Sequence, residues 1–243
     1  MPKLSVLVSP PPGGRADDVV TRLREAMYLG ILKPGDQLPT EVDLAQQFGV
    51  APMTVRDALA VLRETGLIET RRGRTGGSFV RRFASPPSDR ARKRLAELTL
   101  SQLRDLVDEH EAVSGQAAAL AAERAAEGNL RRLFHLADEL QSATTPAECI
   151  RADSRFHVEV AVAAQSERLT RQEVRLQTEI CGMLWFPDGP AIEQAAIVAE
   201  HHDIASAVSD GDADLARRHA HRHVRNSMPR LTKLHLHVTE QAE

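Results

Sequence analysis

The sequence has few aromatic residues, only two cysteines and no long apolar run. Six Phe, one Trp and one Tyr make up 3% of the 243 residues, so the core has to be built mainly from Leu, Ala and Val. Because Ala and Leu favour helices, this composition indicates a mainly α-helical protein. Apolar residues still amount to 42% of the chain, which is enough to bury a core and excludes an intrinsically disordered protein.

No apolar run approaches the roughly 18 residues that a membrane-spanning helix needs, so no membrane partner is expected. The first segment, MPKLSVLVSPPPGG, does not fit a signal peptide, and we interpret residues 1–14 as a flexible arm. Cys149 and Cys181 are too few for a disulfide framework in a chain of this length. They are expected to be reduced thiols, and the protein is expected in the cytoplasm.

The formal net charge of −3 hides an uneven distribution along the chain. Residues 1–82 contain 12 Lys and Arg against 9 Asp and Glu, whereas the remainder contains 19 against 25. A basic N-terminal part followed by an acidic C-terminal part suggests two domains with different partners.

The basic part shows the pattern of a winged helix-turn-helix. Apolar residues recur at helical spacing over 15–30, and helices are also predicted over about 41–47 and 52–65. Two short strand-like segments, 67–70 and 78–80, then flank a glycine-rich turn. Helix, helix, turn, helix and hairpin together predict a DNA-binding domain over residues 15–82.

The third predicted helix carries polar residues on its first turns, where such motifs meet the major groove. Thr54 and Arg56 lie away from its apolar face; a hydroxyl suits phosphate, and arginine suits phosphate or guanine. A solvated basic hairpin and a capping threonine are the alternative interpretation. The candidate DNA contacts are Thr40, Thr54, Arg56, Arg71, Arg72, Arg74 and Gly76.

Proline, serine and a basic run in FASPPSDRARKR predict a linker, which we place at residues 83–97. The rest, 98–240, shows only helical patterns and predicts an all-α bundle. These patterns cover residues 99–110, 112–127, 129–141, 146–164, 166–185, 189–209 and 211–240.

Histidines cluster in three of these predicted helices. Asp153 and His157 are four residues apart and share a helix face, EHHD contributes His201, and HAHRH contributes His223. One carboxylate and three imidazoles form a set typical of a divalent transition metal. We therefore predict a metal site with zinc or nickel, and manganese as a further candidate.

The front part resembles the reader domain of GntR-family transcription regulators, through PGDQLPTE, LAQQFGV, TVRDAL, LRETGLI and the glycine-rich wing. The resemblance implies that Thr54, Arg56, Arg72 and Gly76 contact operator DNA. Two positions depart from the family pattern, because Val42 stands where an Arg is frequent and Ala51-Pro52 where a Ser/Thr-Arg pair is frequent. The operator sequence of relatives therefore cannot be transferred.

The back part resembles the FCD ligand domain of the FadR subfamily, through DLVDEHEAVSGQAAALAAERAA, DSRFH and EHHDIASAVSDGDADLARRHAHRH. The resemblance implies a metal held by Asp153, His157, His201 and His223 beside a pocket for small organic acids, and its spacing selects His223 over His219. Where relatives commonly place an effector-binding Arg, this chain has His110. His110 and the nearby Asp108 are therefore the candidate effector contacts.

These features together predict a ligand-responsive transcription regulator, a repressor that binds near-palindromic operator DNA as a homodimer. A purely structural metal without an effector is one alternative. A metalloenzyme is another, although the chain has neither a Gly-x-Ser-x-Gly nor a His-Glu-x-x-His motif.

Overall fold

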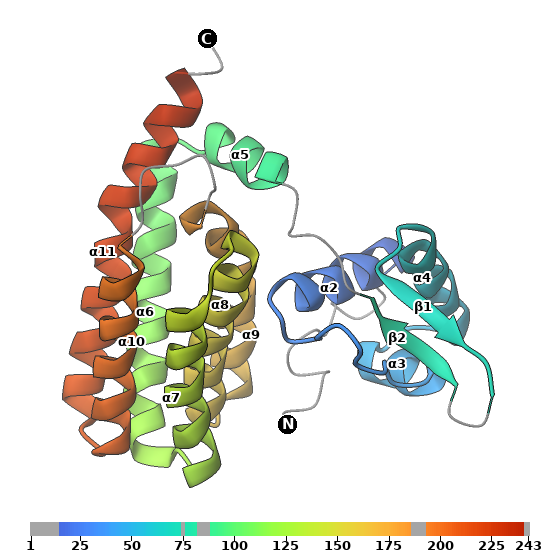
Figure 1. The fold of residues 1–243 in the computed structure, drawn as a ribbon, viewed down its shortest axis with the longest axis horizontal. Coiled ribbons are helices and arrows are strands. Elements are labelled where there is room, and N and C mark those ends of the chain that lie inside the picture. The colour runs from blue at the N-terminus through green and yellow to red at the C-terminus, as the bar shows by residue number, and fades with distance from the viewer. Residues whose placement is uncertain (1–14, 74–75, 82–87, 186–192, 241–243) are drawn as a thin grey trace. The chain divides into compact units, whose positions relative to one another are not determined.

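The computed structural model describes residues 15–73, 76–81, 88–185 and 193–240 (Figure 1). The chain divides into two compact units, residues 1–84 and 85–243. The expected arm, 1–14, lies outside the described residues.

The first unit is a winged helix-turn-helix. Its elements are α2 (Ala16–Tyr28), α3 (Glu41–Phe48), α4 (Pro52–Glu64), β1 (Ile68–Arg71) and β2 (Gly77–Val80). The Thr40 hydroxyl accepts the Asp43 amide and so caps α3, while Pro52 occupies the first turn of α4, where a missing N–H costs nothing. Strands β1 and β2 pair antiparallel to form the wing, with Ile68 opposite Val80.

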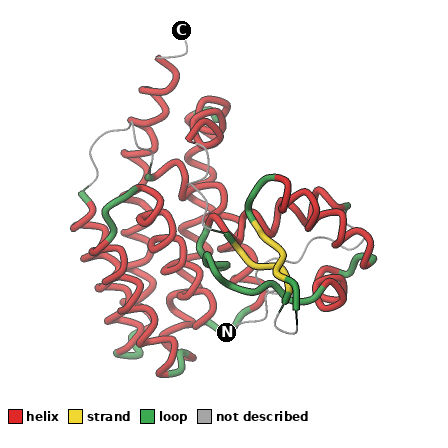
Figure 2. Tube along the Cα trace, turned by 45° about the vertical axis from the view of Figure 1, so that its right-hand side comes forward, coloured by secondary structure: helices red, strands yellow, loops and turns green. Residues whose placement is uncertain are grey.

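The second unit contains only helices in its described residues (Figure 2). They are α5 (Ser88–Glu97), α6 (Leu100–Arg124), α7 (Glu127–Ser142), α8 (Pro146–Ala163), α9 (Glu167–Leu184), α10 (Gln194–Ser209) and α11 (Ala213–Glu240). The predicted fold class, a two-stranded winged helix-turn-helix followed by an all-α bundle, is confirmed.

The largest differences from the sequence prediction concern α5 and α6, while residues 83–87 of the expected linker and 189–192 of the predicted helix 189–209 lie outside the described residues. The second part of the expected linker is helix α5, because Leu95 is buried against the bundle and Arg94 forms an ion pair with Glu179 of α9. The predicted helices 99–110 and 112–127 are one helix, α6, since Glu111 continues the helix and bonds with Arg225 of α11.

Helices α6 and α11 approach closely at one glycine. A Cβ placed on Gly115 would lie 1.9 Å from Nε2 of His221, so no larger residue fits there without a shift. On the neighbouring turns, α6 buries Ala117, Ala118 and Ala121. The His221 imidazole therefore occupies the space beside Gly115, and a larger residue there would have to displace that ring.

Helix α11 contains an internal proline, Pro229. Proline has no N–H, so the usual helical hydrogen bond to the carbonyl of Arg225, four residues earlier, is missing.

Neither cysteine contributes a disulfide, since Cys149 and Cys181 are both free and buried. Burial raises the pKa of Cys149 to about 11 and that of Cys181 to about 12, so both thiols stay protonated near neutral pH. Among the described helices, none is long and apolar enough to cross a membrane.

Candidate metal centre and the neighbouring cavity

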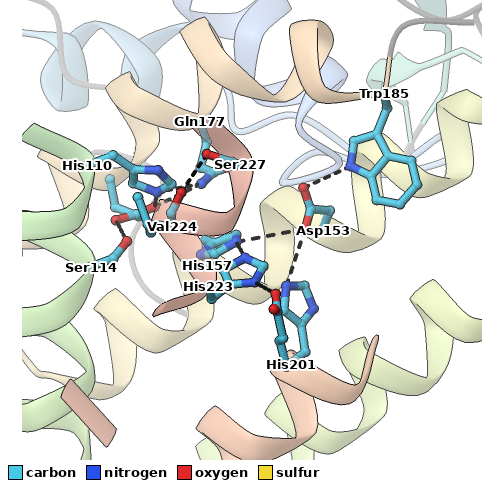
Figure 3. Close-up of polar contacts among 12 residues, drawn as sticks. His110, Ser114, Asp153, His157, Gln177, Trp185, His201, His223, Val224 and Ser227 are labelled. Atoms are coloured by element: carbon cyan, nitrogen blue, oxygen red, sulfur yellow. Dashed lines mark hydrogen bonds and ion pairs between the residues drawn. The ribbon is translucent and has the colours of Figure 1, made fainter. Parts of the chain in front are cut away.

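Four side chains from three helices converge inside the bundle (Figure 3). Asp153 and His157 come from α8, His201 from α10 and His223 from α11. Nε2 of His157 lies 3.1 Å from Nε2 of His223, and Oδ1 of Asp153 lies 3.3 Å from Nε2 of His201 and 3.8 Å from Nε2 of His157. One ligand atom from each residue lies within 4.8 Å of the others.

Two neighbouring groups orient these side chains. The indole Nε1 of Trp185 donates to Oδ2 of Asp153 at 2.9 Å, which leaves Oδ1 directed at the histidines (Figure 3). Oε2 of Glu200 lies 2.7 Å from Nδ1 of His223, so a proton on Nδ1 leaves the Nε2 lone pair free. Contacts of this kind fix the tautomer and direction of metal-binding side chains.

The donor set fits a transition-metal ion. Neither ring nitrogen of His201 makes a hydrogen bond of good geometry in the described structure, the residue is 0% exposed, and the acceptor that faces Nε2 is Oδ1 of Asp153 at 3.3 Å. Leaving such atoms unsatisfied is costly, and a metal would satisfy one of them. With metal–ligand bonds of roughly 2.0–2.2 Å, adjacent donor atoms lie about 3.0–3.6 Å apart, close to the separations found here.

The ionisation states suit ligation as well. Burial acts to raise the pKa of Asp153, but the adjacent His201 and His157 outweigh it, and the pKa lies below its usual range. Burial lowers the pKa of both His157 and His201. A carboxylate and neutral imidazoles are the forms that bind metal.

A cavity of about 390 Å³ opens beside the four residues, a size that suits a small ligand. Asp153, His157 and His223 line it, and α11 adds two cationic side chains, Arg230 and Lys233. Other lining residues are His110, Gln177, Leu184, Trp185, Glu193, Ala196, Ile197, Glu200, Val224, Asn226, Ser227 and Pro229.

The two residues expected to contact an effector lie differently. His110 is buried on the cavity wall, and its Nε2 lies 3.1 Å from Oε1 of Glu173, which Ser114 and Gln177 also contact. Asp108 is exposed on α6 and does not line the cavity. The structure therefore brings His110, but not Asp108, to the predicted pocket.

The other histidines of the EHHD and HAHRH segments lie outside the four-residue cluster. His202 lies 3.2 Å from Asp138, and His221 lies 3.5 Å from Glu111. His219 faces Asp203 at 3.8 Å.

In the first unit, the residues predicted to contact DNA lie on α4 and near the start of α3. Thr54 is half-buried on the first turn of α4, while Thr40 is exposed as the cap of α3. Arg56 is exposed, and its NH2 group lies 3.0 Å from Glu41. This arginine therefore has a protein partner that DNA would have to replace or share.

The wing carries Arg71 and Arg72, both exposed. The Arg71 guanidinium lies over the Phe79 ring, 4.3 Å from its centroid. A Cβ on Gly76 would lie 2.5 Å from the Arg71 carbonyl oxygen, so the turn excludes any larger residue. Arg74 lies outside the described residues.

Several residues of the site were not predicted as functional. Trp185 and Glu200 orient two of the four clustered side chains, and Arg230 faces the cavity. Glu200 directly precedes His201 in the sequence, which was a usable signal. Trp185 follows the last residue of α9, and its contact with α8 depends on helix packing that a spacing pattern does not contain.

Comparisons with known proteins identify both units. Residues 15–80 match the family of bacterial regulatory proteins called gntR, and residues 105–226 match the FCD domain. RmpR of Mycobacterium gastri, named as an HTH-type transcriptional regulator, is 42% identical over 216 residues, which cover 88% of this chain and 79% of RmpR. The Uxu operon regulator of Haemophilus influenzae is 28% identical over 223 residues, covering 87% and 80%.

A solved structure shares the fold. E. coli McbR/YncC superposes with a TM-score of 0.52 at 20% identity, covering 96% of this chain and 98% of that one. Taken with the sequence matches, the winged reader and the helical bundle establish that the chain belongs to the gntR family of bacterial regulatory proteins, as a DNA-binding transcription regulator with an FCD domain and not an enzyme.

Proposed function

We propose that this regulator binds a divalent transition metal through Asp153, His157, His201 and His223, and that a small organic acid enters the adjacent cavity to control DNA binding. The observation that carries the proposal is the convergence of four ligand atoms within 4.8 Å of one another around the wholly buried His201, whose ring nitrogens make no hydrogen bond of good geometry in the described structure. Zinc or nickel suits three nitrogens and one oxygen, and manganese is a further candidate.

The metal would offer a coordination position to an effector oxygen. A metal that accepts more than four ligands would keep positions free beside the four protein donors, and three of those donors, Asp153, His157 and His223, line the cavity. Trp185 and Glu200 hold Asp153 and His223 in place, so the protein groups are arranged before the effector arrives. This arrangement favours an effector-binding site over a purely structural one.

On the DNA side, we propose that Thr54 and Arg56 enter the major groove while Arg71, Arg72 and Gly76 bring the wing to the backbone. Thr40 and Arg74 complete the proposed set. A homodimer would read a near-palindromic operator, because two-fold symmetric readers require repeated half-sites. Repression follows if the operator overlaps a promoter. The effector acts by binding two protein states with different affinity.

Metal content tests the first half of this proposal. Wild-type protein purified without chelator should contain about one zinc or nickel ion per chain, and Asp153→Ala and His201→Ala should lose it. His202→Ala is the matched control, since His202 stands next to His201 but faces Asp138. Metal-free wild-type protein after soaking in zinc, nickel and manganese would overturn the metal site.

DNA selection tests the second half. Selection from a random duplex library should enrich a near-palindromic site, and light scattering should show a dimer. Enrichment of a single half-site by a monomer would contradict the dimeric reader without affecting the metal site.

A further inference from the structure

The cavity contains a cation that has no ion-pair partner among the described residues. Arg230 is partly buried on α11, and its Nε is enclosed without a hydrogen-bond partner in that part of the chain. Three other arginines of the same helix are paired, since Arg217 bonds Asp214, Arg222 bonds Asp203 and Arg225 bonds Glu111. Arg230 thus differs from its neighbours in facing a cavity rather than a carboxylate.

An aromatic ring connects Arg230 to the metal cluster. The guanidinium carbon of Arg230 lies 5.5 Å from the centroid of Trp185, and the indole Nε1 of Trp185 donates to Asp153. The ring restricts the guanidinium and leaves its N–H groups available to a ligand. Burial lowers the pKa of Arg230 to about 10, so the side chain remains positively charged near neutral pH.

His110 is poorly placed to supply that charge. Its Nε2 lies 3.1 Å from Oε1 of the buried Glu173, so that ring nitrogen already has a partner within the protein. Lys233 also lines the cavity but is exposed, so water screens its charge. A guanidinium can bind a carboxylate through two parallel hydrogen bonds, which an imidazole cannot do.

We propose that Arg230 is the anion-binding residue of the effector cavity and pairs with the carboxylate of a small organic acid. The inference deepens the proposed function by naming the residue that selects the charged end of the ligand. The anion-binding position lies on the last helix of the bundle, α11, in place of the first-helix position that His110 occupies. A ligand held there would extend past the Trp185 ring and direct a second oxygen toward the predicted metal position beside Asp153, His157 and His223.

The test is calorimetric titration of full-length protein with acetate, L-lactate and succinate. Acetamide and lactamide serve as probes of similar shape without the negative charge. Arg230→Gln removes the cation, and Arg230→Lys keeps the charge but not the two-pronged geometry. Arg225→Gln is the matched control, because Arg225 lies on the same helix and binds Glu111 outside the cavity. Trp185 is the only tryptophan, so its emission reports binding next to Arg230 in the same samples.

We expect the wild type and Arg225→Gln to bind at least one carboxylate and neither amide. Arg230→Gln should bind that carboxylate about 10- to 100-fold more weakly, and Arg230→Lys should fall between. Equal affinity in Arg230→Gln and the wild type would overturn the assignment. So would a wild type that binds none of the three acids at up to about 10 mM.

Zinc content, measured on each sample, separates this inference from the metal proposal. Arg230→Gln should retain the zinc of the wild type, since Arg230 is not one of the four predicted ligands. If the wild type holds no zinc and the Arg230→Gln variant loses carboxylate binding, the metal site fails and the arginine assignment stands. If zinc is bound and carboxylate affinity does not depend on Arg230, the metal site stands and the arginine assignment fails.

Discussion

Replacing His201 with phenylalanine should abolish metal binding and yet stabilise the metal-free protein. His201 is 0% exposed, its Nδ1 has no hydrogen-bond partner in the described structure, and its Nε2 faces Oδ1 of Asp153 at 3.3 Å. A buried, unsatisfied polar group such as Nδ1 costs about 1–3 kcal/mol. A phenyl ring removes that group and keeps the stack on Phe156, whose ring centroid lies 3.9 Å away at an interplanar angle of 7°, while Asp153 keeps its hydrogen bond from Trp185.

We therefore expect the His201→Phe variant, in chelator, to gain about 1–3 kcal/mol in the free energy of unfolding. For a protein of this size, that gain corresponds to a rise in Tm of roughly 2–10 °C. Zinc should raise the Tm of the wild type by mass action and leave that of the variant unchanged. The fluorescence emission of Trp185, the only tryptophan, reports the unfolding of the helical unit and not of the DNA-binding unit.

The control is His202→Gln, which alters the adjacent, partly exposed imidazole and should keep the zinc response. Two results would refute the reasoning. A metal-free His201→Phe protein less stable than the metal-free wild type would mean that the lost contact with Asp153 outweighs the unsatisfied Nδ1. A zinc response that survives in the variant would mean that His201 is not a ligand.

Three further predictions concern other contacts. Trp185→Phe keeps the ring but deletes the hydrogen bond to Asp153, so zinc affinity should fall about 10- to 100-fold in a chelator competition assay. Gly115→Ala should lower the free energy of unfolding by about 1–3 kcal/mol in urea denaturation, because the new methyl group collides with His221. Arg56→Gln should weaken operator binding and, if it loses one phosphate contact, reduce the salt slope by about one in fluorescence anisotropy.

Two of these predictions have a matched control variant. Gly128 is also helical, but a Cβ added there would have nothing within 4 Å, so Gly128→Ala should stabilise the protein by helix propensity. If both alanine variants stabilise, the close approach of α6 and α11 does not constrain the bundle. Arg63→Gln, on the exposed last turn of α4, should leave operator affinity near the wild-type value. Unchanged zinc affinity in Trp185→Phe would show that the indole does not orient Asp153.

Much of the fold could be predicted, because its signals are local. Thr40 caps a helix, Pro52 begins one and glycines interrupt the wing, and each residue acts within a few positions of its own place in the chain. The errors arose where local signals are silent. No residue between 99 and 124 indicates whether the chain forms one helix or two. The sequence of α5 looks like a basic linker, and its helix is recognisable only once Leu95 packs against the bundle.

The candidate site was predictable to a smaller extent. Helical periodicity placed Asp153 and His157 on one face, and the resemblance to the FCD domain added His201 and selected His223 over His219. Arg230 and Trp185 give no such signal, because an arginine in an amphipathic helix is usually solvated. Their relation to the cavity exists only once α8, α9 and α11 are packed.

Helix α11 has a point at Pro229 where it can bend. The missing hydrogen bond to the Arg225 carbonyl lies between His223, which faces the metal cluster, and Arg230, which faces the cavity. A helix bends most readily where a bond is already absent. If the proposed effector bridges the two positions, the residues that hold its two ends lie on segments of one helix joined at Pro229, and a bend there would change the distance between them.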